Sequence, residues 1–416
     1  MKNFSLSLLI FFLSCCQKTV SAQFILEKQS RSSFGWPVAD FACNDSLLTN
    51  FSKQLPKNSI AYNHLSHTDA LTTSKQQTLT DLLPLIGLDG YASYFLHTGD
   101  TASIRKRYPE IKLLLNDIDL DKKGLLKNSN PPEAFKLVEK DFDFSLLNNI
   151  WYYMALDGAS LMASVTDNEH EVGEYQYRRQ AFRDQFNENF WKDNTYKSGK
   201  NKTLTDDRAN GLAIVAALPT SLEASQLTTF LGTNQRSTLY LEKYVLEGLF
   251  LLNENQEAIR RIKERIKNIA TAQQKEDLSE QQWTSVYATL LSDYVAGIRP
   301  LEAAFSKVII QPHMGALTNI NAHLNSPKGK INLNLEYNPD NNSLRMTVDI
   351  PTKCKGIISV PIIADIYKYI TCNNRLIFSN QQYISHSLTE LDLVMGNEHY
   401  LNFEVSKGGK YVFEAR

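Results

Sequence analysis

The chain has 416 residues, with 44 lysines and arginines against 45 aspartates and glutamates, which gives a formal net charge of −1. Hydrophobic residues make up 43% and charged residues 21%, so apolar side chains suffice for a core and intrinsic disorder is excluded. A basic nucleic-acid binder is also excluded, because the chain has no sustained stretch of lysine and arginine. The length predicts two or three domains.

The first residues predict an export signal. An apolar run over residues 4–13 is about half as long as the roughly 20 residues that cross a bilayer, which is typical of a signal peptide. Cleavage after Ala22 would make residues 1–22 the signal. Alternatively, residues 12–15 resemble a bacterial lipobox, in which Cys15 carries a lipid tether. We therefore expect an exported protein that is either secreted or held as a periplasmic or cell-surface lipoprotein.

The remaining cysteines are Cys43, Cys354 and Cys372. Their odd number excludes a complete disulfide framework, although Cys354 and Cys372 are able to form one bridge. His64 and His67 lie three residues apart in a polar stretch, which is more typical of surface histidines than of a metal site. The chain has no zinc, dinucleotide or phosphate-loop motif, so we expect no metal and no cofactor.

Helical periodicity dominates the chain before residue 300. Apolar residues at spacings of three and four predict a long helix through Leu146, Ile150 and Leu161, and a second helix from about Glu169 to Trp191. The same spacing predicts helices near 91–96, 104–115, 212–218, 240–249, 259–266 and 280–296. Short polar loops join about eleven or twelve helices in antiparallel pairs, and stacking the pairs in a ring buries one face of each. The absence of a repeat of fixed length argues against a regular solenoid.

After residue 300 the pattern changes to short strands. Runs of β-branched and aromatic residues lie at 308–310, 331–337, 344–350, 357–361, 367–371 and 400–405. From Lys330 to Leu335, apolar side chains alternate with asparagines, so one face of this strand is apolar and the other carries amides. Residues 338–341 are a turn signal between two of the runs. The sequence therefore predicts a mainly α domain over 23–300 and a β-sandwich over 301–416.

One segment of the helical part, Thr205 to Asn210, has an unusual density of polar residues. Thr205 or Asp206 is able to cap the apolar helix that follows, and acids in a first turn complement the positive end of a helix. Alternatively, the segment forms a polar cluster that suits sugar hydroxyls. A second segment, Tyr240 to Glu247, is explained most simply as an amphipathic helix with solvated charges.

These two segments, together with Tyr294 to Glu302, resemble the six-hairpin catalytic domain of bacterial α-L-rhamnosidases, glycoside hydrolase family seventy-eight. Their order and spacing match, residues 94–109 resemble an early hairpin, and Ile310 to Gly315 resembles the junction to the family's C-terminal β-domain. The resemblance covers most of residues 80–416. It implies a mainly α fold, an (α/α)6 six-hairpin barrel followed by a β-domain, whose central cleft binds terminal rhamnose.

The resemblance also implies a set of substrate-binding residues. They are Trp36, Asp206, Asp207, Arg208, Asn210, Glu242 and Trp283, of which the two tryptophans align with family tryptophans. Trp151 and Trp191 lie within helical periodicity and are expected in the core. The implied partner is a rhamnose-containing glycan, and no nucleic acid.

The catalytic residues depart from the family pattern. Enzymes of this family invert the anomeric centre with two carboxyl groups about 6.5–9.5 Å apart, one protonating the leaving oxygen and one activating water. The stretch that matches the family's acid motif, Glu27 to Trp36, has Ser32 at the position of the acid. A serine hydroxyl cannot protonate a glycosidic oxygen usefully, because its pKa is far from the working range. At the helix that follows the family's base, Gln281 replaces a histidine, and the loop before it lacks a Trp-Glu pair.

Two functions follow from these departures. In the first, the chain is a rhamnosidase with relocated carboxylates: Asp40, Asp141 or Asp143 as the acid, and Glu276 or Glu280 as the base. In the second, the barrel has lost hydrolysis and persists as a glycan-binding or accessory protein. A truncated product without a stable barrel is a third alternative. Loss of one member of an acid–base pair costs about 10²–10⁴ in rate, so we favour the family assignment with impaired or absent catalysis.

Overall fold

The computed structural model describes residues 40–54, 83–84, 86–87, 90–127, 144–198, 207–233, 239–272, 286–384 and 388–416. These residues form two compact units. The β unit contains residues 40–53 and 291–416, and the helical unit contains the described residues between 54 and 290. This division differs from the boundary expected at residue 300, because residues 40–53 and 291–300 both belong to the β unit.

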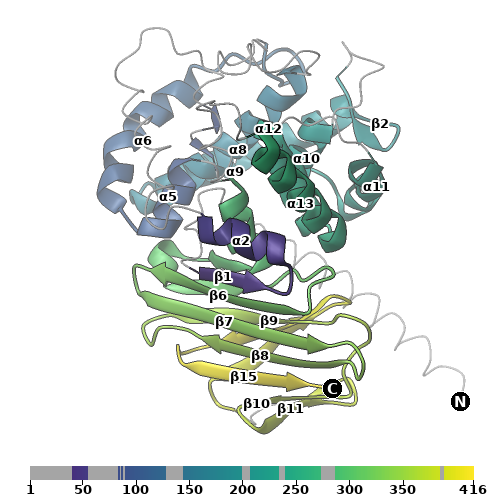
Figure 1. The fold of residues 1–416 in the computed structure, drawn as a ribbon. Helices are drawn as coiled ribbons and strands as arrows, with labels where there is room; N and C mark the ends of the chain where they lie inside the picture. Colours follow the sequence, from purple (N-terminus) through teal and green to yellow (C-terminus); the bar gives the residue numbers. More distant parts are fainter. Residues whose placement is uncertain are drawn as a thin grey trace, which may run out of the picture. The chain divides into compact units, whose positions relative to one another are not determined.

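In the helical unit, helices that are buried on all sides alternate with amphipathic ones. The helices are α5 (Tyr91–Thr98), α6 (Thr101–Asn116), α8 (Phe144–Val165), α9 (Glu169–Phe190), α10 (Asp207–Val215), α11 (Ser221–Thr233), α12 (Leu239–Leu251) and α13 (Asn255–Ala272) (Figure 1). All nine residues of α10 are buried, whereas α9 buries only Tyr175, Phe182, Phe186 and Phe190. An inner and an outer layer of helices require this alternation, because an inner helix has neighbours all round and an outer helix on one side only.

Most predicted helices are confirmed, and their ends have local causes. Asp100 caps α6 by accepting a hydrogen bond from the backbone N–H of Ser103, and Gly99 ends α5 with a left-handed φ of 72°. α10 ends at Val215, before the expected end at residue 218, since Ala217 adopts a φ of 58°. The sequence does not predict α11. No described helix is both long and apolar enough to span a bilayer.

The β unit contains a larger and a smaller sheet. The larger sheet has the order β1-β6-β7-β8-β15-β10-β11-β12, and the smaller has the order β13-β14-β9-β5-β4. The strands of the larger sheet are β1 (Asp40–Cys43), β6 (Asn319–Ser326), β7 (Gly329–Asn338), β8 (Ser343–Asp349), β10 (Tyr369–Cys372), β11 (Arg375–Ser379), β12 (Gln382–Tyr383) and β15 (Lys410–Ala415). Those of the smaller sheet are β4 (Ile298–Pro300), β5 (Lys307–Ile310), β9 (Lys355–Pro361), β13 (Leu391–Gly396) and β14 (Tyr400–Val405).

The two sheets share an apolar core. Alternate residues of β6, β7 and β8 are buried, and the residues between them are half-buried or exposed. Phe403 of the smaller sheet contacts Phe413 of the larger sheet, with ring centroids 5.4 Å apart. These contacts confirm the predicted β-sandwich.

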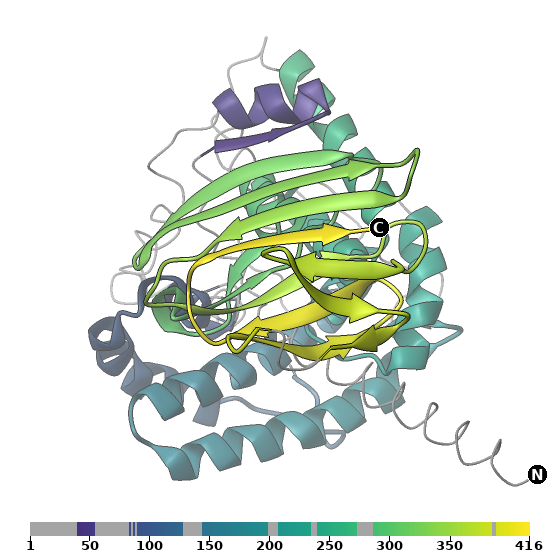
Figure 2. The same cartoon turned by 90° about the horizontal axis from the view of Figure 1, so that it is seen from below.

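The edge of the larger sheet comes from the early part of the chain. β1 pairs antiparallel with β6, and Asp40 lies opposite His323. Figure 2 shows β1 and α2 (Ser46–Gln54), in purple, beside the green strands of this sheet. The sequence does not predict this strand, because four residues are too few to show a clear alternation.

The possible disulfide between Cys354 and Cys372 does not form. Both cysteines are free and buried, and Cys43 is also free. Cys354 directly precedes β9 of the smaller sheet and Cys372 ends β10 of the larger sheet, so each packs beside its own strand. Burial raises the pKa of both thiols, that of Cys372 to about 12, which keeps them protonated.

Candidate functional site

Two buried helices, α10 and α12, approach each other closely because glycines lie at their crossing. A Cβ on Gly211 would lie 2.8 Å from the Cα of Val245 and 2.9 Å from the carbonyl oxygen of Tyr244. A Cβ on Gly248 would in turn lie 3.3 Å from the carbonyl oxygen of Gly211. Backbone contact therefore holds the middle of α10 against the middle of α12.

Two predicted site residues lie on these helices and are buried. Asp207 is the first residue of α10 and Glu242 lies in the first turn of α12, and their exposed fractions are 0% and 3%. Burial raises the pKa of the Glu242 carboxyl, and the charge of Asp207 adds to that rise. Tyr287 lies in the same electrostatic environment, since burial and the charge of Glu242 both raise the pKa of its hydroxyl. The two carboxyl groups and the phenol are thus near enough to influence one another electrostatically.

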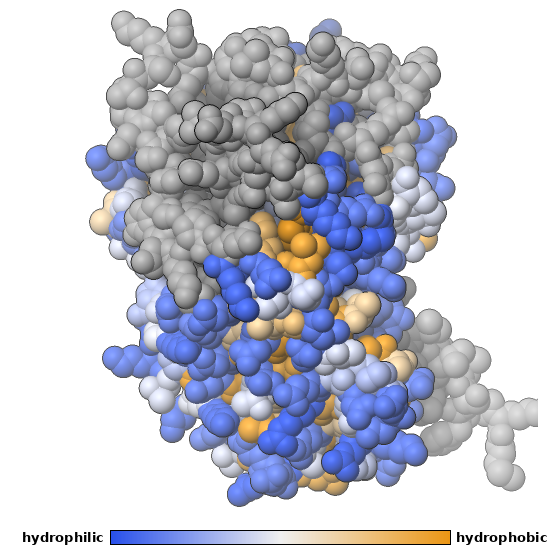
Figure 3. All heavy atoms as spheres, viewed as in Figure 1, coloured by the Kyte–Doolittle hydropathy of each residue, from blue (hydrophilic) through white to orange (hydrophobic). Residues whose placement is uncertain are grey.

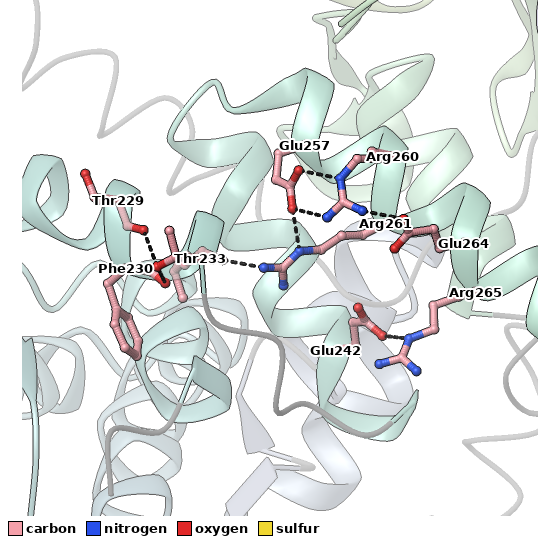
Figure 4. Close-up of polar contacts among 10 residues, drawn as sticks. Thr229, Phe230, Thr233, Glu242, Glu257, Arg260, Arg261, Glu264 and Arg265 are labelled. Carbon is pink, nitrogen blue, oxygen red and sulfur yellow. Dashed lines mark hydrogen bonds and ion pairs between the residues drawn. The ribbon is translucent and has the colours of Figure 1, made fainter. Parts of the chain in front are cut away.

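A guanidinium group from α13 compensates the charge of Glu242 (Figure 4). Arg265 donates a hydrogen bond from Nε to Oε2 of Glu242 and forms an ion pair with it. Arg261 is fully buried and donates from Nε to Oε1 of Glu257 at 2.9 Å and from Nη2 to the Leu231 carbonyl. We refer to Asp207, Glu242, Arg261, Arg265 and Tyr287 as the Glu242 cluster.

The Glu242 cluster is suited to proton chemistry as well as to ion pairing. Burial raises the pKa of Glu242 above its ordinary value of 4.5, and the charges of Arg265 and Arg261 limit that rise. A buried carboxyl whose pKa is raised by its surroundings holds a proton closer to neutral pH, as a general acid must. The same burial makes the ion pair with Arg265 costly to break, because an uncompensated charge would be left inside.

Arg208 and Asn210 follow Asp207 on α10, and both are buried. The Asn210 side chain accepts a hydrogen bond from the Tyr196 backbone N–H at 2.8 Å and donates one to the Tyr196 carbonyl at 3.1 Å. Asn210 therefore fastens β3 (Thr195–Tyr196), which pairs with β2 (Trp191–Lys192), to α10. Its expected contact with a sugar stays a prediction.

The charged residues of α12 are not solvated, so the interpretation of residues 240–247 as a helix with a solvated charged face is wrong. Lys243 and Glu247 are 9% and 2% exposed and form an ion pair of 3.5 Å one turn apart. The ammonium of Lys243 also lies 4.9 Å from the centre of the Tyr244 ring. Charges are buried here because α12 is an inner helix whose whole circumference is covered.

Several predicted residues lie outside the described part of the chain, and their roles stay predictions. They are Ser32, Trp36, Asp141, Asp143, Asp206, Glu276, Glu280, Gln281 and Trp283. Asp40 is described, and it lies on β1 in the β unit, 3.3 Å from Nδ1 of His323. Trp151 is in the core as expected. Trp191 is only half-buried, so its expected place in the core is wrong; its ring centroid lies 4.9 Å from that of Tyr196.

The sequence does not predict the arginines and the tyrosine of the Glu242 cluster. Arg261 and Arg265 are one turn apart and flank Ile262 on α13, so helical spacing places them beside the buried apolar stripe. Spacing alone cannot show whether such an arginine extends into solvent or inward to a carboxylate. Among the described residues, no group of three or more His, Cys, Asp or Glu side chains is placed to hold a metal ion.

Two family models match the chain. The bacterial alpha-L-rhamnosidase 6 hairpin glycosidase domain matches residues 88–233, a range that includes Asp207, Arg208 and Asn210. The bacterial alpha-L-rhamnosidase C-terminal domain matches residues 297–368. No curated protein sequence matches the chain.

Solved structures of α-L-rhamnosidases have the same fold. The enzyme from Streptomyces avermitilis, solved in complex with L-rhamnose, is 14% identical with a TM-score of 0.67, over 92% of this chain and 42% of that one. The enzyme from Dictyoglumus thermophilum is 17% identical with a TM-score of 0.64, over 78% of this chain and 38% of that one. The enzyme from Aspergillus terreus is 10% identical with a TM-score of 0.64, over 90% of this chain and 50% of that one.

The chain thus spans between 38% and 50% of the length of these enzymes. At such identities the likeness shows the fold, and the expected six-hairpin helical domain followed by a β-domain is confirmed. Through the six-hairpin domain matched at residues 88–233 and the C-terminal domain matched at residues 297–368, the chain belongs to the bacterial alpha-L-rhamnosidase family.

Proposed function

We propose that the helical unit recognises terminal α-L-rhamnosides and that hydrolysis by this chain is strongly impaired. One observation carries the proposal: the segment matched to the six-hairpin glycosidase domain delivers Asp207 into a buried cluster with Glu242. Carboxylates and guanidinium groups are the side chains that form the strongest hydrogen bonds to sugar hydroxyls. The Streptomyces avermitilis enzyme of this fold binds L-rhamnose itself.

Sequence departures support the loss of hydrolysis. Ser32 stands where the resemblance places the acid, and Gln281 stands where it places a histidine. Glu242, which the structure does describe, is held by the ion pair with Arg265. Loss of either member of an acid–base pair lowers the rate by about 10²–10⁴, so a chain that lacks both retains little turnover.

A second candidate is an active glycosidase, and the raised pKa of Glu242 favours it. In this alternative Glu242 protonates the leaving oxygen, and one of the predicted carboxylates, Asp141, Asp143 or Glu280, acts as the partner. The two candidates require the same ligand and differ only in turnover.

Calorimetric titration of the full chain with L-rhamnose, paired with release of nitrophenol from 4-nitrophenyl α-L-rhamnoside, separates the candidates. We expect binding with turnover at least about 10² below that of an active family enzyme assayed alongside. Glu242→Gln should weaken binding, while the matched control Glu264→Gln, which changes an exposed residue of α13, should not. Turnover at the level of the active enzyme that falls with Glu242→Gln would support the second candidate. Neither binding nor turnover would contradict both.

We also propose that the protein is exported, with a lipid on Cys15 or with cleavage after Ala22. Intact mass measurement of the protein from its native host distinguishes the two forms, because the lipid adds mass and directs the protein into a detergent phase. Cys15→Ser should move a lipidated protein to the aqueous phase and leave a protein cleaved after Ala22 unchanged. A mature chain that still begins at Met1 would contradict export.

A further inference from the structure

The outer face of the larger sheet carries an uncharged band that runs across five strands. Strand register places Ala42 opposite Asn321, Asn321 opposite Asn334, and Asn334 opposite Thr347. Thr347 lies opposite Val412 on β15. We refer to Ala42, Asn321, Asn334, Thr347 and Val412 as the neutral band. Neighbouring strands lie about 4.8 Å apart, so the band is about 19 Å long.

The polar groups of the neutral band face solvent. Asn321 and Asn334 are exposed and Thr347 is half-buried, on the face opposite the apolar core. Within the described part of the chain, the two side-chain amides and the hydroxyl form no hydrogen bond with another residue. Hydrophilic residues predominate over β6, β7 and β8 in Figure 3, which views the molecule from the same side as Figure 1. Each amide thus offers two donors and one acceptor oxygen to a ligand.

Charged residues flank the neutral band on both sides, and acids outnumber bases among them. One flanking row contains Asp40, His323, Asn332, Asp349 and Lys410, and the other contains Asn319, Glu336, Arg345, Glu414 and Thr371. Several of these charges are already paired, Asp40 with His323 at 3.3 Å and Arg345 with Glu414 at 2.7 Å. An acidic ligand would be repelled by the remaining carboxylates, whereas an uncharged one would not.

We propose that the neutral band is a second carbohydrate site, which binds an uncharged glycan chain several sugars long. The amides of Asn321 and Asn334 and the hydroxyl of Thr347 donate to and accept from sugar hydroxyls. The length of the band exceeds that of a single sugar, so a monosaccharide leaves most of it unfilled. This site belongs to the β unit alone and does not depend on rhamnose binding by the helical unit.

Affinity gel electrophoresis of the full chain tests this site. The probes are three soluble neutral polysaccharides (dextran, galactomannan and a mixed-linkage β-glucan) and one acidic one, polygalacturonate. We expect at least one neutral probe to retard the protein and polygalacturonate not to. The double variant Asn321→Ala/Asn334→Ala should weaken the retardation about tenfold, since several hydrogen bonds are lost.

Asn325→Ala is the matched control, because Asn325 is exposed on the same strand as Asn321 but lies outside the neutral band. It should leave the retardation unchanged, and all variants should keep the wild-type thermal midpoint. Calorimetric binding of L-rhamnose should be unaffected by the double variant, which separates this site from the proposed function. The proposal is overturned if no neutral probe retards the chain, if only polygalacturonate does, or if the double variant behaves like the wild type.

Discussion

The helical unit and the β unit bury very different side chains. On the inner helices α10 and α12, the charged residues Asp207, Arg208, Glu242, Lys243 and Glu247 are all buried. In the β unit, the buried charged residues Asp293 and Arg299 both lie in the segment 291–313. Among the described residues from 314 onward, the buried polar residues are Ser359 and Asn402. The sandwich core is therefore almost purely apolar.

This difference shows where each unit gains its specificity. A sandwich needs only alternating apolar residues to stabilise its core, and it leaves its polar residues on the outer faces. Buried charges seldom stabilise a fold more than apolar residues of similar size, so their concentration on inner helices points to a role in recognition or chemistry. The segment 291–313 is the part of the β unit that buries charged side chains, as the inner helices do.

The largest expected effect lies in that segment. Gly297 has a φ of 70°, and a Cβ there would lie 1.8 Å from the Gln311 carbonyl oxygen. Gly297→Ala should lower the free energy of unfolding by at least about 4 kcal/mol, because neither the backbone nor the neighbour can yield. Chemical denaturation measures this loss. Gly173→Ala, on exposed α9 with nothing within 4 Å, is the control and should raise stability by up to about 1 kcal/mol. If Gly297→Ala and Gly173→Ala changed the free energy of unfolding equally, the steric constraint at Gly297 would be disproved.

Acidification should affect the helical unit through His97. Burial lowers its pKa from 6.5 to about 4, so the unfolded chain binds a proton more readily than the folded one between these values. The stability contribution of neutral His97 is complete above pH 6.5 and is lost as the pH falls towards 4, a difference of about 3 kcal/mol. Unfolding curves at several pH values check this. His97→Gln should make the free energy of unfolding depend less on pH in this range. His170→Gln, which changes an exposed histidine, should leave the dependence unchanged. A slope unchanged by His97→Gln would contradict it.

A smaller effect is expected where a buried charge loses its partner. Arg265→Met should lower the free energy of unfolding by about 2 kcal/mol, because Glu242 is left buried without its ion-pair partner. The loss stays at this size because the Arg265 side chain is 27% exposed, so water partly reaches the ion pair. The loss should shrink at low pH, where Glu242 becomes protonated. Arg260→Met is matched on the same helix, but its ion pairs are exposed, so a change below about 1 kcal/mol is expected. If Arg265→Met and Arg260→Met lowered the free energy of unfolding by similar amounts, the burial of Glu242 would add nothing to the cost of losing its partner.

Much of the fold follows from local pattern. The apolar spacing through Leu146 and Ile150 predicts α8, and the run from Tyr400 to Val405 predicts β14 with its observed ends. β1, β6 and α11 are not predicted, because short or polar-rich elements gain their order from partners distant in sequence. The exposed amides of β7 are predicted from alternation alone.

The site is predicted only in part, for a related reason. Asp207 and Glu242 lie in segments that resemble the family, and they lie on two helices that contact each other through glycines. Arg265 comes from a helix whose sequence suggests an exposed basic face, and nothing local indicates that it turns inward. Three-dimensional packing decides that choice.

The pairing of β1 with β6 makes the helical unit an insertion in the β unit, since β1 and β6 lie on either side of it in the chain. During synthesis, β1 emerges about 280 residues before its partner and cannot pair with it until β6 has also been made. A fragment cut at residue 300 would therefore expose the edge of β6 and invite other chains to add to it.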